Sequence, residues 1–468
     1  MISLPMHRLV SFFFGSLLWL PWTARAAEPR PNILLLFLDN VGYGDLGCYG
    51  NRGVKTPGLD RLAGEGVRCT DFYIGSPSCT PSRGALLTGR HPERNGLSYQ
   101  LSAQENRGGE GLPAPEKIIP QYLRPLGYAT GAFGKWNLGF APGSRPTERG
   151  FDEFLGHISG NIHYYKHLYH GQNDLRRGTE PVDLRGQYST DLFADAAIDF
   201  IRRHRERPWF VYLPFNAAHF IGPQNVEPGE KLEWQVPAKY LALYGCPPDE
   251  PDEKKRFRAV LTALDDAIGR VLGAVDDLKL RERTLVLCIS DNGAFMLPGR
   301  GLETQTNRPL RGGGVTTYEG GIRVPAIVRW PGRIPPGTVC GEMLSSLDVL
   351  PLALAAAGGT LPDDRAVDGR NPLQALAGAA PSPHGALHWV WNQGRKEQWR
   401  ALREANYKIV RRADNQPWEL YDLSADLGEA KDLADEKPAQ VEALAEKFQR
   451  WQESVKADPT RGISARTR

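Results

Sequence analysis

The sequence predicts an α/β fold, in which a large mixed, mostly parallel β-sheet lies between layers of helices and a small α+β subdomain follows at the C-terminus. Short, continuous apolar runs at residues 32–38, 209–213 and 284–289 are typical of strands that are buried on both faces of a sheet. Amphipathic helical patterns at residues 192–205 and 255–280 alternate with these runs. This alternation indicates parallel strands that are joined by helices.

The last part of the chain has a different character. Strand-like pieces precede one amphipathic helix: they lie at residues 387–391, 399–403, 407–410 and 418–421, and the helix lies at residues 438–455. We therefore expect one large domain over residues 27–380. Residues 381–468 are expected to form a subdomain with a short antiparallel sheet and a terminal helix.

Residues 1–26 have the pattern of a secretory signal peptide. A basic start precedes an apolar run over residues 9–20, and Ala24, Arg25 and Ala26 form a small-x-small cleavage site. The alternative is a membrane anchor, but the run is shorter than the roughly 20 residues that cross a bilayer. We expect an exported protein, periplasmic or secreted, without a membrane span after cleavage.

Composition narrows the range of partners. The chain has 468 residues, of which 41% are hydrophobic and 24% charged, as expected of a globular protein with a large core. Its formal net charge of +3 and the lack of basic runs argue against a nucleic-acid partner. Six scattered cysteines without a CxxC pattern argue against a disulfide scaffold and against a thiolate metal cluster.

Polar pairs follow two of the predicted strands directly. Asp39 and Asn40 come after the first strand, and Asp291 and Asn292 come after the strand at 284–289. Sites in sheets of this kind gather at the carboxyl ends of the strands. Asp/Asn pairs are also common turn residues, so either pair alone would be weak evidence for a site.

The stretch CTPSRGALLTGR, residues 79–90, predicts a short helix with Cys79 at its start. Pro81 suits the first helical turn, Gly89 can cap the end, and Arg83 lies one turn after Cys79. The positive end of a helix attracts anions. From these residues alone, Cys79 could be a low-pKa thiolate, a metal ligand, half of a disulfide, a residue that is converted after synthesis, or a buried core cysteine.

This stretch resembles the signature CxPSRxxLLTGR of the formylglycine-dependent sulfatases, which belong to the alkaline phosphatase superfamily, and it matches every fixed position. Other blocks are similar to that family in the same order: PNILLLFLDNVGYGDLGCYG near the N-terminus, GKWNLG at 134–139, RGFDEFLG at 149–156, DDAIGRVL, SDNG at 290–293, TTYEGGIRVPAIVRWPG at 316–332 and ELYDLSAD at 419–426. The resemblance covers nearly the whole chain after the predicted signal peptide. It implies an alkaline phosphatase-like fold, with residues 27–380 as the catalytic domain.

The resemblance implies that a formylglycine-generating or equivalent sulfatase-modifying enzyme oxidises Cys79 to formylglycine. A hydrated aldehyde carries two hydroxyls, of which one takes up the sulfate and the other expels it, whereas a serine would be left as a stable ester. By the same resemblance, Arg83 holds residue 79 or the sulfate, and Lys135 binds sulfate oxygens. His219 contacts the substrate and protonates the departing alcohol.

The resemblance also implies a bound calcium ion. A hard divalent cation prefers oxygen ligands, and it would attract an anionic ester and activate the attacking oxygen. The implied ligands are Asp39, Asn40, Asp291, Asn292 and the modified side chain of Cys79.

Three positions depart from the pattern of that family. Asn40 stands where an aspartate is usual, Asn137 replaces a histidine that contacts the modified residue, and Gly314 replaces a sulfate-binding lysine. An amide oxygen can still bind a cation, and an amide can keep a hydrogen bond but cannot carry a proton near neutral pH. The departures are compatible with an active subgroup, which we favour, or with a degenerate homologue that binds without turnover.

Histidines are concentrated in GHISGNIHYYKHLYH, which contains His157, His163, His167 and His170. They could line the substrate pocket, where we expect His163 and Asn137 to contact the substrate. The alternative is an exposed polar loop, and the spacing is not that of a convincing metal site.

The sequence therefore predicts a hydrolase that cleaves a sulfate monoester, with a sulfated small molecule or glycan as substrate. A carbohydrate ester is the expected substrate, although the residues support a sulfate ester better than a carbohydrate. One alternative is a phosphate or phosphonate ester hydrolase of the same superfamily. Another is a non-catalytic protein that binds sulfated glycans.

Overall fold

A computed structural model describes residues 1–2, 30–101, 110–226, 229, 234–296, 305–392 and 398–462. Most of the predicted signal peptide, residues 1–26, lies outside the described residues. Within the described part of the chain, no helix is both long enough and apolar enough to cross a membrane.

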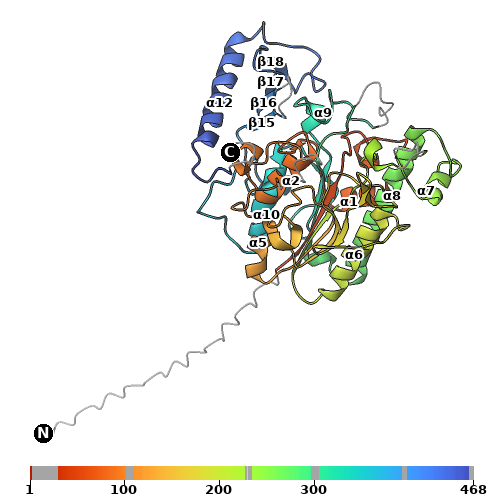
Figure 1. Ribbon diagram of the computed structural model, residues 1–468. Coiled ribbons are helices and arrows are strands. Elements are labelled where there is room, and N and C mark those ends of the chain that lie inside the picture. Colours follow the sequence, from red (N-terminus) through yellow and green to blue (C-terminus); the bar gives the residue numbers. More distant parts are fainter. Residues whose placement is uncertain are drawn as a thin grey trace.

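The described residues include a mixed sheet of ten strands (Figure 1). In spatial order the strands are β13 (Thr338–Cys340), β2 (Val67–Cys69), β12 (Ala326–Arg329), β11 (Thr284–Ser290), β1 (Asn32–Leu38), β10 (Trp209–Pro214), β4 (Ala129–Lys135), β5 (Glu153–His157), β8 (Leu175–Arg177) and β9 (Glu180–Pro181). The five central strands from β11 to β5 run parallel, and β12, on one side, and β8, on the other, pair antiparallel with them. This arrangement confirms the predicted mixed, mostly parallel sheet.

Helices cover both faces of the sheet because the side chains of β1 alternate between two apolar cores. Ile33, Leu35 and Phe37 face one core, whose helical members include residues of α2 (Cys79–Thr88), α5 (Ile119–Leu123) and α10 (Val349–Ala356). Leu34, Leu36 and Leu38 face the other core, which is built with α1 (Pro57–Glu65), α6 (Ser189–Arg203) and α8 (Glu253–Asp277). Figure 1 shows these two groups of helices on opposite sides of the strands.

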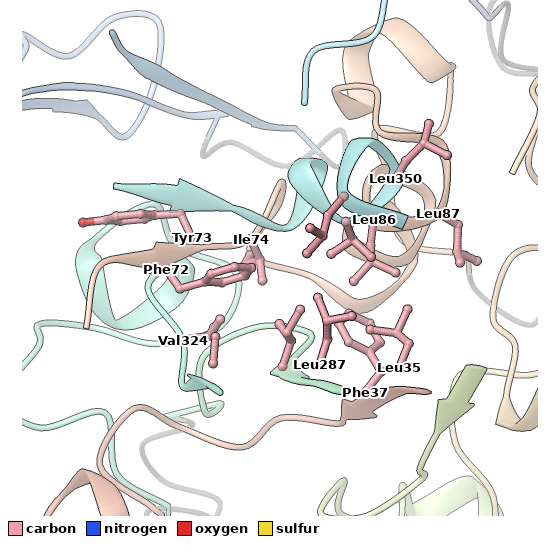
Figure 2. Packing of buried hydrophobic residues seen from close by; sticks show 14 of the residues in the cluster. Leu35, Phe37, Phe72, Tyr73, Ile74, Leu86, Leu87, Leu287, Val324 and Leu350 are labelled. Atoms are coloured by element: carbon pink, nitrogen blue, oxygen red, sulfur yellow. The ribbon is translucent and has the colours of Figure 1, made fainter. Parts of the chain in front are cut away.

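Apolar packing fixes the position of α2 on the sheet. Figure 2 shows Leu86 and Leu87 of α2 beside Leu350 of α10, over Leu35 and Phe37 of β1 and Leu287 of β11. All of these side chains are buried. The start of α2 is thereby held near the carboxyl ends of β1 and β11.

The C-terminal subdomain consists of a four-stranded antiparallel sheet and one helix, as predicted (Figure 1). Its elements are β15 (Leu387–Asn392), β16 (Gln398–Glu404), β17 (Tyr407–Arg411), β18 (Glu419–Asp422) and α12 (Pro438–Lys456). Leu444 and Phe448 of α12 pack on Leu402 and Ile409 of the sheet.

Shorter strands and α-helices lie between these elements. They are β3 (Phe72–Tyr73), paired with β14 (Leu344–Ser345), β6 (Leu168–Tyr169), paired with β7 (Gln172–Asn173), and the helices α3 (Pro92–Asn95), α7 (Ala238–Ala242), α9 (Glu319–Ile322) and α11 (Leu373–Leu376).

A buried ionic cluster joins the C-terminal sheet to the large domain. The ammonium of Lys408, on β17, donates to carboxylates of Glu319 and Glu429, both at 2.8 Å. The backbone N–H of Glu319, the first residue of α9, donates to Glu429 at 2.7 Å. The guanidinium of Arg311 donates to the carbonyl of Glu429 at 2.7 Å. The segment from Arg311 to α9 is therefore fixed by the C-terminal subdomain.

Aromatic stacking forms a second contact between the two parts. His388 of β15 stacks on Trp451 of α12, with ring centroids 4.5 Å apart, and His91 meets the same indole edge-on. One ring nitrogen of His91 accepts from the N–H of Glu93 and the other contacts the carbonyl of His388, so the ring has its partners in the neutral form. Burial lowers the pKa of His91 to about 4 and that of His388 to about 3.

These two histidines predict a loss of stability in acid. Their folded-state pKa values lie below the unfolded value of about 6.5, so the unfolded chain takes up protons first as the pH falls. The stabilisation is complete above about pH 6.5 and declines toward the folded-state values, by on the order of 1.4 kcal/mol per pH unit for each ring. His388→Phe keeps a ring on Trp451 but cannot titrate, so its melting temperature should fall less steeply between about pH 6.5 and 4.

The matched control is Trp418→Phe, which changes an aromatic ring packed on Phe448 of α12, with ring centroids 5.4 Å apart, and removes no titratable group. Its pH dependence should be parallel to that of the wild type. Parallel curves for the wild type and His388→Phe would contradict the prediction.

Candidate functional site

The two polar pairs meet at the carboxyl ends of β1 and β11. These strands pair in register, with Leu38 opposite Ser290, so Asp39 and Asn40 emerge beside Asp291 and Asn292. The N–H of Asn40 donates to Asp291 Oδ1 at 3.0 Å, and Asn292 Nδ2 donates to Asn40 Oδ1 at 2.7 Å. All four side chains are buried.

The backbone after each strand turns sharply. Asn40 has a φ of +56°, a left-handed conformation that asparagine tolerates better than most residues. Gly293 lies so close to α9 that a Cβ there would be 1.7 Å from the carbonyl oxygen of Gly320. Only glycine fits this position, which explains the glycine of SDNG.

Cys79, the first residue of α2, faces this group. Its Sγ lies 3.8 Å from Asp39 Oδ1 and 3.9 Å from Asn40 Oδ1. Burial, and then the carboxylate of Asp291, raise the pKa of the thiol. All six cysteines are free in the structure, so the geometry favours neither a reactive thiolate nor half of a disulfide.

Two buried cations balance the two carboxylates. Lys135, the last residue of β4, donates from Nζ to Asp39 Oδ2 at 2.5 Å. The guanidinium of Arg83 donates to Asp291 Oδ2 at 2.7 Å and lies 3.5 Å from Asp39 Oδ2. A second Arg83 nitrogen donates to the carbonyl of Lys135 at 3.2 Å. All four charged groups are fully buried, and their formal charges cancel.

His219 follows β10 and reaches the same group. One of its ring nitrogens, Asp39 and Cys79 offer possible ligand atoms that lie within 4.8 Å of one another. Its Nδ1 lies 2.6 Å from the carbonyl oxygen of Phe220, so Nδ1–H donates to it and Nε2 remains for another partner. Burial, and then the ammonium of Lys135, lower the pKa of His219 to about 3.

Asn137, two residues after the end of β4, and His157, the last residue of β5, are two further polar residues near Lys135. Asn137 is fully buried at a φ of +54°, and neither atom of its amide has a hydrogen-bond partner among the described residues. His157 pairs with Lys135 across β4 and β5, and its Nε2 also lacks a partner in that part of the chain. Both groups lie near Lys135, where they are available to hydrogen-bond an anionic ligand.

The loop histidines have other contacts. Nδ1 of His163 accepts from the N–H groups of Tyr165 and Lys166, and its Nε2 lies 2.6 Å from the amide nitrogen of Gln235. His167 contacts the carbonyl of Gln187, and His170 is exposed. The His163 ring thus lies against its own loop and Gln235, and its expected contact with substrate stays a prediction.

An aromatic ring lies against Gly314. A Cβ at this position would be 3.2 Å from the Phe295 ring and 3.1 Å from the carbonyl oxygen of Gly293. A longer side chain would therefore require Phe295 to move. This close packing explains why a glycine fits here.

A pocket of about 420 Å³ opens onto Cys79 and His219. Its other lining residues are Ser78, Gln100, Leu101, Gly160, Asn161, Tyr169, Phe220, Gly222, Gln224, Phe295 and Val315. Sequence reasoning did not identify these residues. Gln100 also accepts from the N–H of Thr80 at 3.0 Å and so caps the start of α2. The arrangement combines buried oxygen donors, two cations and an open pocket, which suits an anionic ligand held with a hard cation.

Comparisons with known proteins agree with this geometry. The family model described as Sulfatase matches residues 31–359, and that described as N-sulphoglucosamine sulphohydrolase, C-terminal, matches residues 315–456. N-acetylgalactosamine-6-sulfatase of Canis lupus familiaris is 36% identical over 380 residues, which cover 76% of this chain and 67% of that protein. Arylsulfatase A of Homo sapiens is 37% identical over 391 residues, which cover 77% and 71%.

A solved structure resembles nearly the whole chain. The crystal structure of Ps i-CgsB in complex with k-i-k-neocarrahexaose matches with a TM-score of 0.79 and 29% identity, over 90% of this chain and 92% of that one.

Proposed function

The chain belongs to the sulfatase family, has the alkaline phosphatase-like fold and is an enzyme of that family, and we propose that it hydrolyses a sulfate monoester of a carbohydrate through a formylglycine made from Cys79. The observation that carries the proposal is the position of Cys79 at the start of α2, facing Asp39 and Asn40 and opening onto the pocket. We propose further that the protein is exported and that a formylglycine-generating or equivalent enzyme converts it.

Residue 79 supplies the nucleophile in this proposal. The Sγ of Cys79 stands in for the oxygens of the hydrated formylglycine, which offers one hydroxyl to attack sulfur and a second to release the sulfate. The raised pKa of the thiol and its burial make the unmodified cysteine a poor nucleophile at neutral pH. The unconverted protein should therefore be inactive.

The residues at the strand ends suit calcium. Asp39, Asn40, Asp291 and Asn292 offer only hard oxygen ligands besides residue 79, and Asn292 Oδ1 is buried without a partner among the described residues. Calcium, when bound, would activate the attacking oxygen and add positive charge. Because the four buried protein charges already cancel, an added divalent cation would make the site positive and favour the binding of an anionic ester.

Three further residues hold the ligands and bind the sulfate in this proposal. Arg83 holds Asp39 and Asp291 in place, since its guanidinium contacts both carboxylates. Lys135 binds the sulfate oxygens and keeps Asp39 oriented. Asn137, whose buried amide lacks a partner in the described chain, donates a hydrogen bond to residue 79 or to the sulfate.

His219 protonates the departing alcohol. In the free protein its ring is neutral, because burial and Lys135 lower its pKa to about 3. A bound sulfate ester brings a negative charge that favours the imidazolium, so substrate binding would raise this pKa. Nδ1 is held by Phe220, which leaves Nε2 to carry the proton.

A carbohydrate substrate is supported by the names of the relatives. The similar proteins include an N-acetylgalactosamine-6-sulfatase and a protein bound to k-i-k-neocarrahexaose. The phosphate or phosphonate alternative stays open, and so does a binding protein without turnover, because Asn40, Asn137 and Gly314 alter the site. Parallel assays with sulfate and phosphate esters of one leaving group distinguish these alternatives.

Cys79→Ala should abolish sulfate ester hydrolysis and leave the melting temperature nearly unchanged, because only one buried atom is lost. Mass spectrometry of the wild-type peptide should show formylglycine at residue 79 in a host with the modifying enzyme. The matched variant Cys79→Ser carries a single hydroxyl, so it should gain one sulfo group and stop. Normal activity of Cys79→Ala would refute the mechanism.

Calcium should raise the melting temperature of the wild type after treatment with a chelator. A ligand at 100 times its Kd stabilises the folded state by about 2.7 kcal/mol. Asp291→Asn should lose most of this shift, because it removes one of two carboxylate ligands. The control Asp265→Asn changes a buried carboxylate that binds the N–H groups of Gly58 and Leu59, and it should keep the shift. An unchanged shift in Asp291→Asn would exclude the charge of this carboxylate as a contributor to calcium binding, and an unchanged shift in Asp291→Ala would exclude the residue as a ligand.

His219→Ala should reduce kcat/KM for sulfated sugar alcohols far more than for an activated phenyl sulfate, whose leaving oxygen hardly needs a proton. General acid catalysis contributes about 10²- to 10⁴-fold, so the difference between the two substrates should be measurable. Equal losses on both would mean that His219 binds sulfate instead.

A further inference from the structure

The pocket beside Cys79 has an apolar side, which consists of Phe220, Phe295 and Val315 and is called the apolar wall below. All three line the same pocket as Cys79 and His219. The rings of Phe220 and Phe295 meet edge-on, with centroids 6.5 Å apart and an angle of 85°. The Phe220 ring also lies against that of His219, with centroids 4.6 Å apart. The apolar wall is thus adjacent to the group that we assign to the leaving alcohol.

Val315 has a backbone conformation that is unfavourable for valine. Its φ is +66°, in the left-handed region where glycine is favoured and β-branched residues are outliers. Such strain costs on the order of 1–3 kcal/mol and is found preferentially at functional sites. A valine here costs stability relative to glycine and places three apolar carbons at the pocket.

The surrounding structure holds the apolar wall in place. The N–H of Val315 donates to the carbonyl of Pro77 at 2.8 Å, two residues before Cys79. Phe295 packs directly on Gly314, where a Cβ would already be within 3.2 Å of its ring. Arg311, which is bound to Glu429, anchors the start of the same segment. The apolar wall is therefore a preformed surface. Little conformational entropy is lost there when a ligand binds.

We propose that the apolar wall contacts the apolar face of the ring that bears the sulfate, and that Phe295 and Val315 select esters of cyclic alcohols over acyclic ones. The inference rests on the proposed hydrolysis of sulfate esters and specifies its substrate class. A pyranose offers a C–H face and an aryl ester offers a π-face, and both bury apolar surface against phenylalanine and valine. Gln100, Asn161 and Gln224 supply polar groups in the same pocket for the hydroxyls of a sugar.

The test compares kcat/KM on cyclic and acyclic esters for the wild type and Val315→Gly. Glycine suits a φ of +66°, so the melting temperature of the variant should be equal or higher, and a loss of activity cannot be ascribed to unfolding. We expect kcat/KM for 4-nitrophenyl sulfate or for monosaccharide sulfates to fall by about 10- to 200-fold. For trifluoroethyl sulfate, which has no ring, we expect less than about a threefold change.

Two further variants sharpen the comparison. Val315→Ala keeps the strained backbone and removes two methyl groups, so its loss on cyclic esters should be intermediate. Val339→Gly removes an exposed valine in β13 and should leave the ratio of cyclic to acyclic rates at the wild-type value. A loss confined to 4-nitrophenyl sulfate would identify an aryl ring as the partner of the wall, and a loss on monosaccharide sulfates a pyranose.

Equal losses on cyclic and acyclic esters, or none in Val315→Gly, would overturn the inference. A wild type that carries formylglycine and cleaves no sulfate ester would instead overturn the proposed function. In that case the wall is tested by the Kd of 4-nitrophenol, measured by calorimetry. It should rise at least about tenfold in Val315→Gly, and an unchanged Kd would exclude the wall.

Discussion

The site depends on a cluster of four buried charges, Asp39, Asp291, Lys135 and Arg83, whose formal charges cancel. In a medium of low polarity each charge is tolerated only because its partners are present, and loss of one leaves another uncompensated. The cluster ties together β1, β11, β4 and α2, because Asp39 and Asp291 directly follow the first two strands, Lys135 ends β4 and Arg83 lies in α2. The same contacts that make the charges tolerable fix the helix that carries Cys79.

The fold was predictable where burial produces uninterrupted apolar runs. β1, β10 and β11 and the helices α6, α8 and α12 were found close to their predicted positions. The neighbouring strands β4 and β5 were not identified, because ATGAFGK and EFLGH contain glycines. These glycines are required by close backbone packing: a Cβ on Gly134 would lie 1.9 Å from the carbonyl oxygen of Pro214, and one on Gly156 1.9 Å from that of Gly134. Strands packed this closely lose the apolar signal on which prediction relies.

The candidate site was predictable where function requires a fixed motif. The motif residues Cys79, Arg83, Lys135 and His219 meet the two polar pairs, although they come from three different segments. The walls of the pocket were not predictable, because Gln100, Phe295 and Val315 belong to loops whose course depends on tertiary contacts. The direction of the His163 ring was not predictable for the same reason, because it depends on contacts of its loop that the sequence does not specify.

The ionic cluster of Lys408, Glu319 and Glu429 has a consequence for the order in which the protein is made. Synthesis runs from the N-terminus, so Cys79 and the strand-end residues exist long before residues 408 and 429 leave the ribosome. The segment from Arg311 to α9, which carries Val315, has its bond to Pro77 within the large domain but gains the contacts of Arg311 and Glu319 to the C-terminal subdomain only then. A nascent chain that has not reached Glu429 therefore lacks the C-terminal contacts that hold the segment behind the apolar wall.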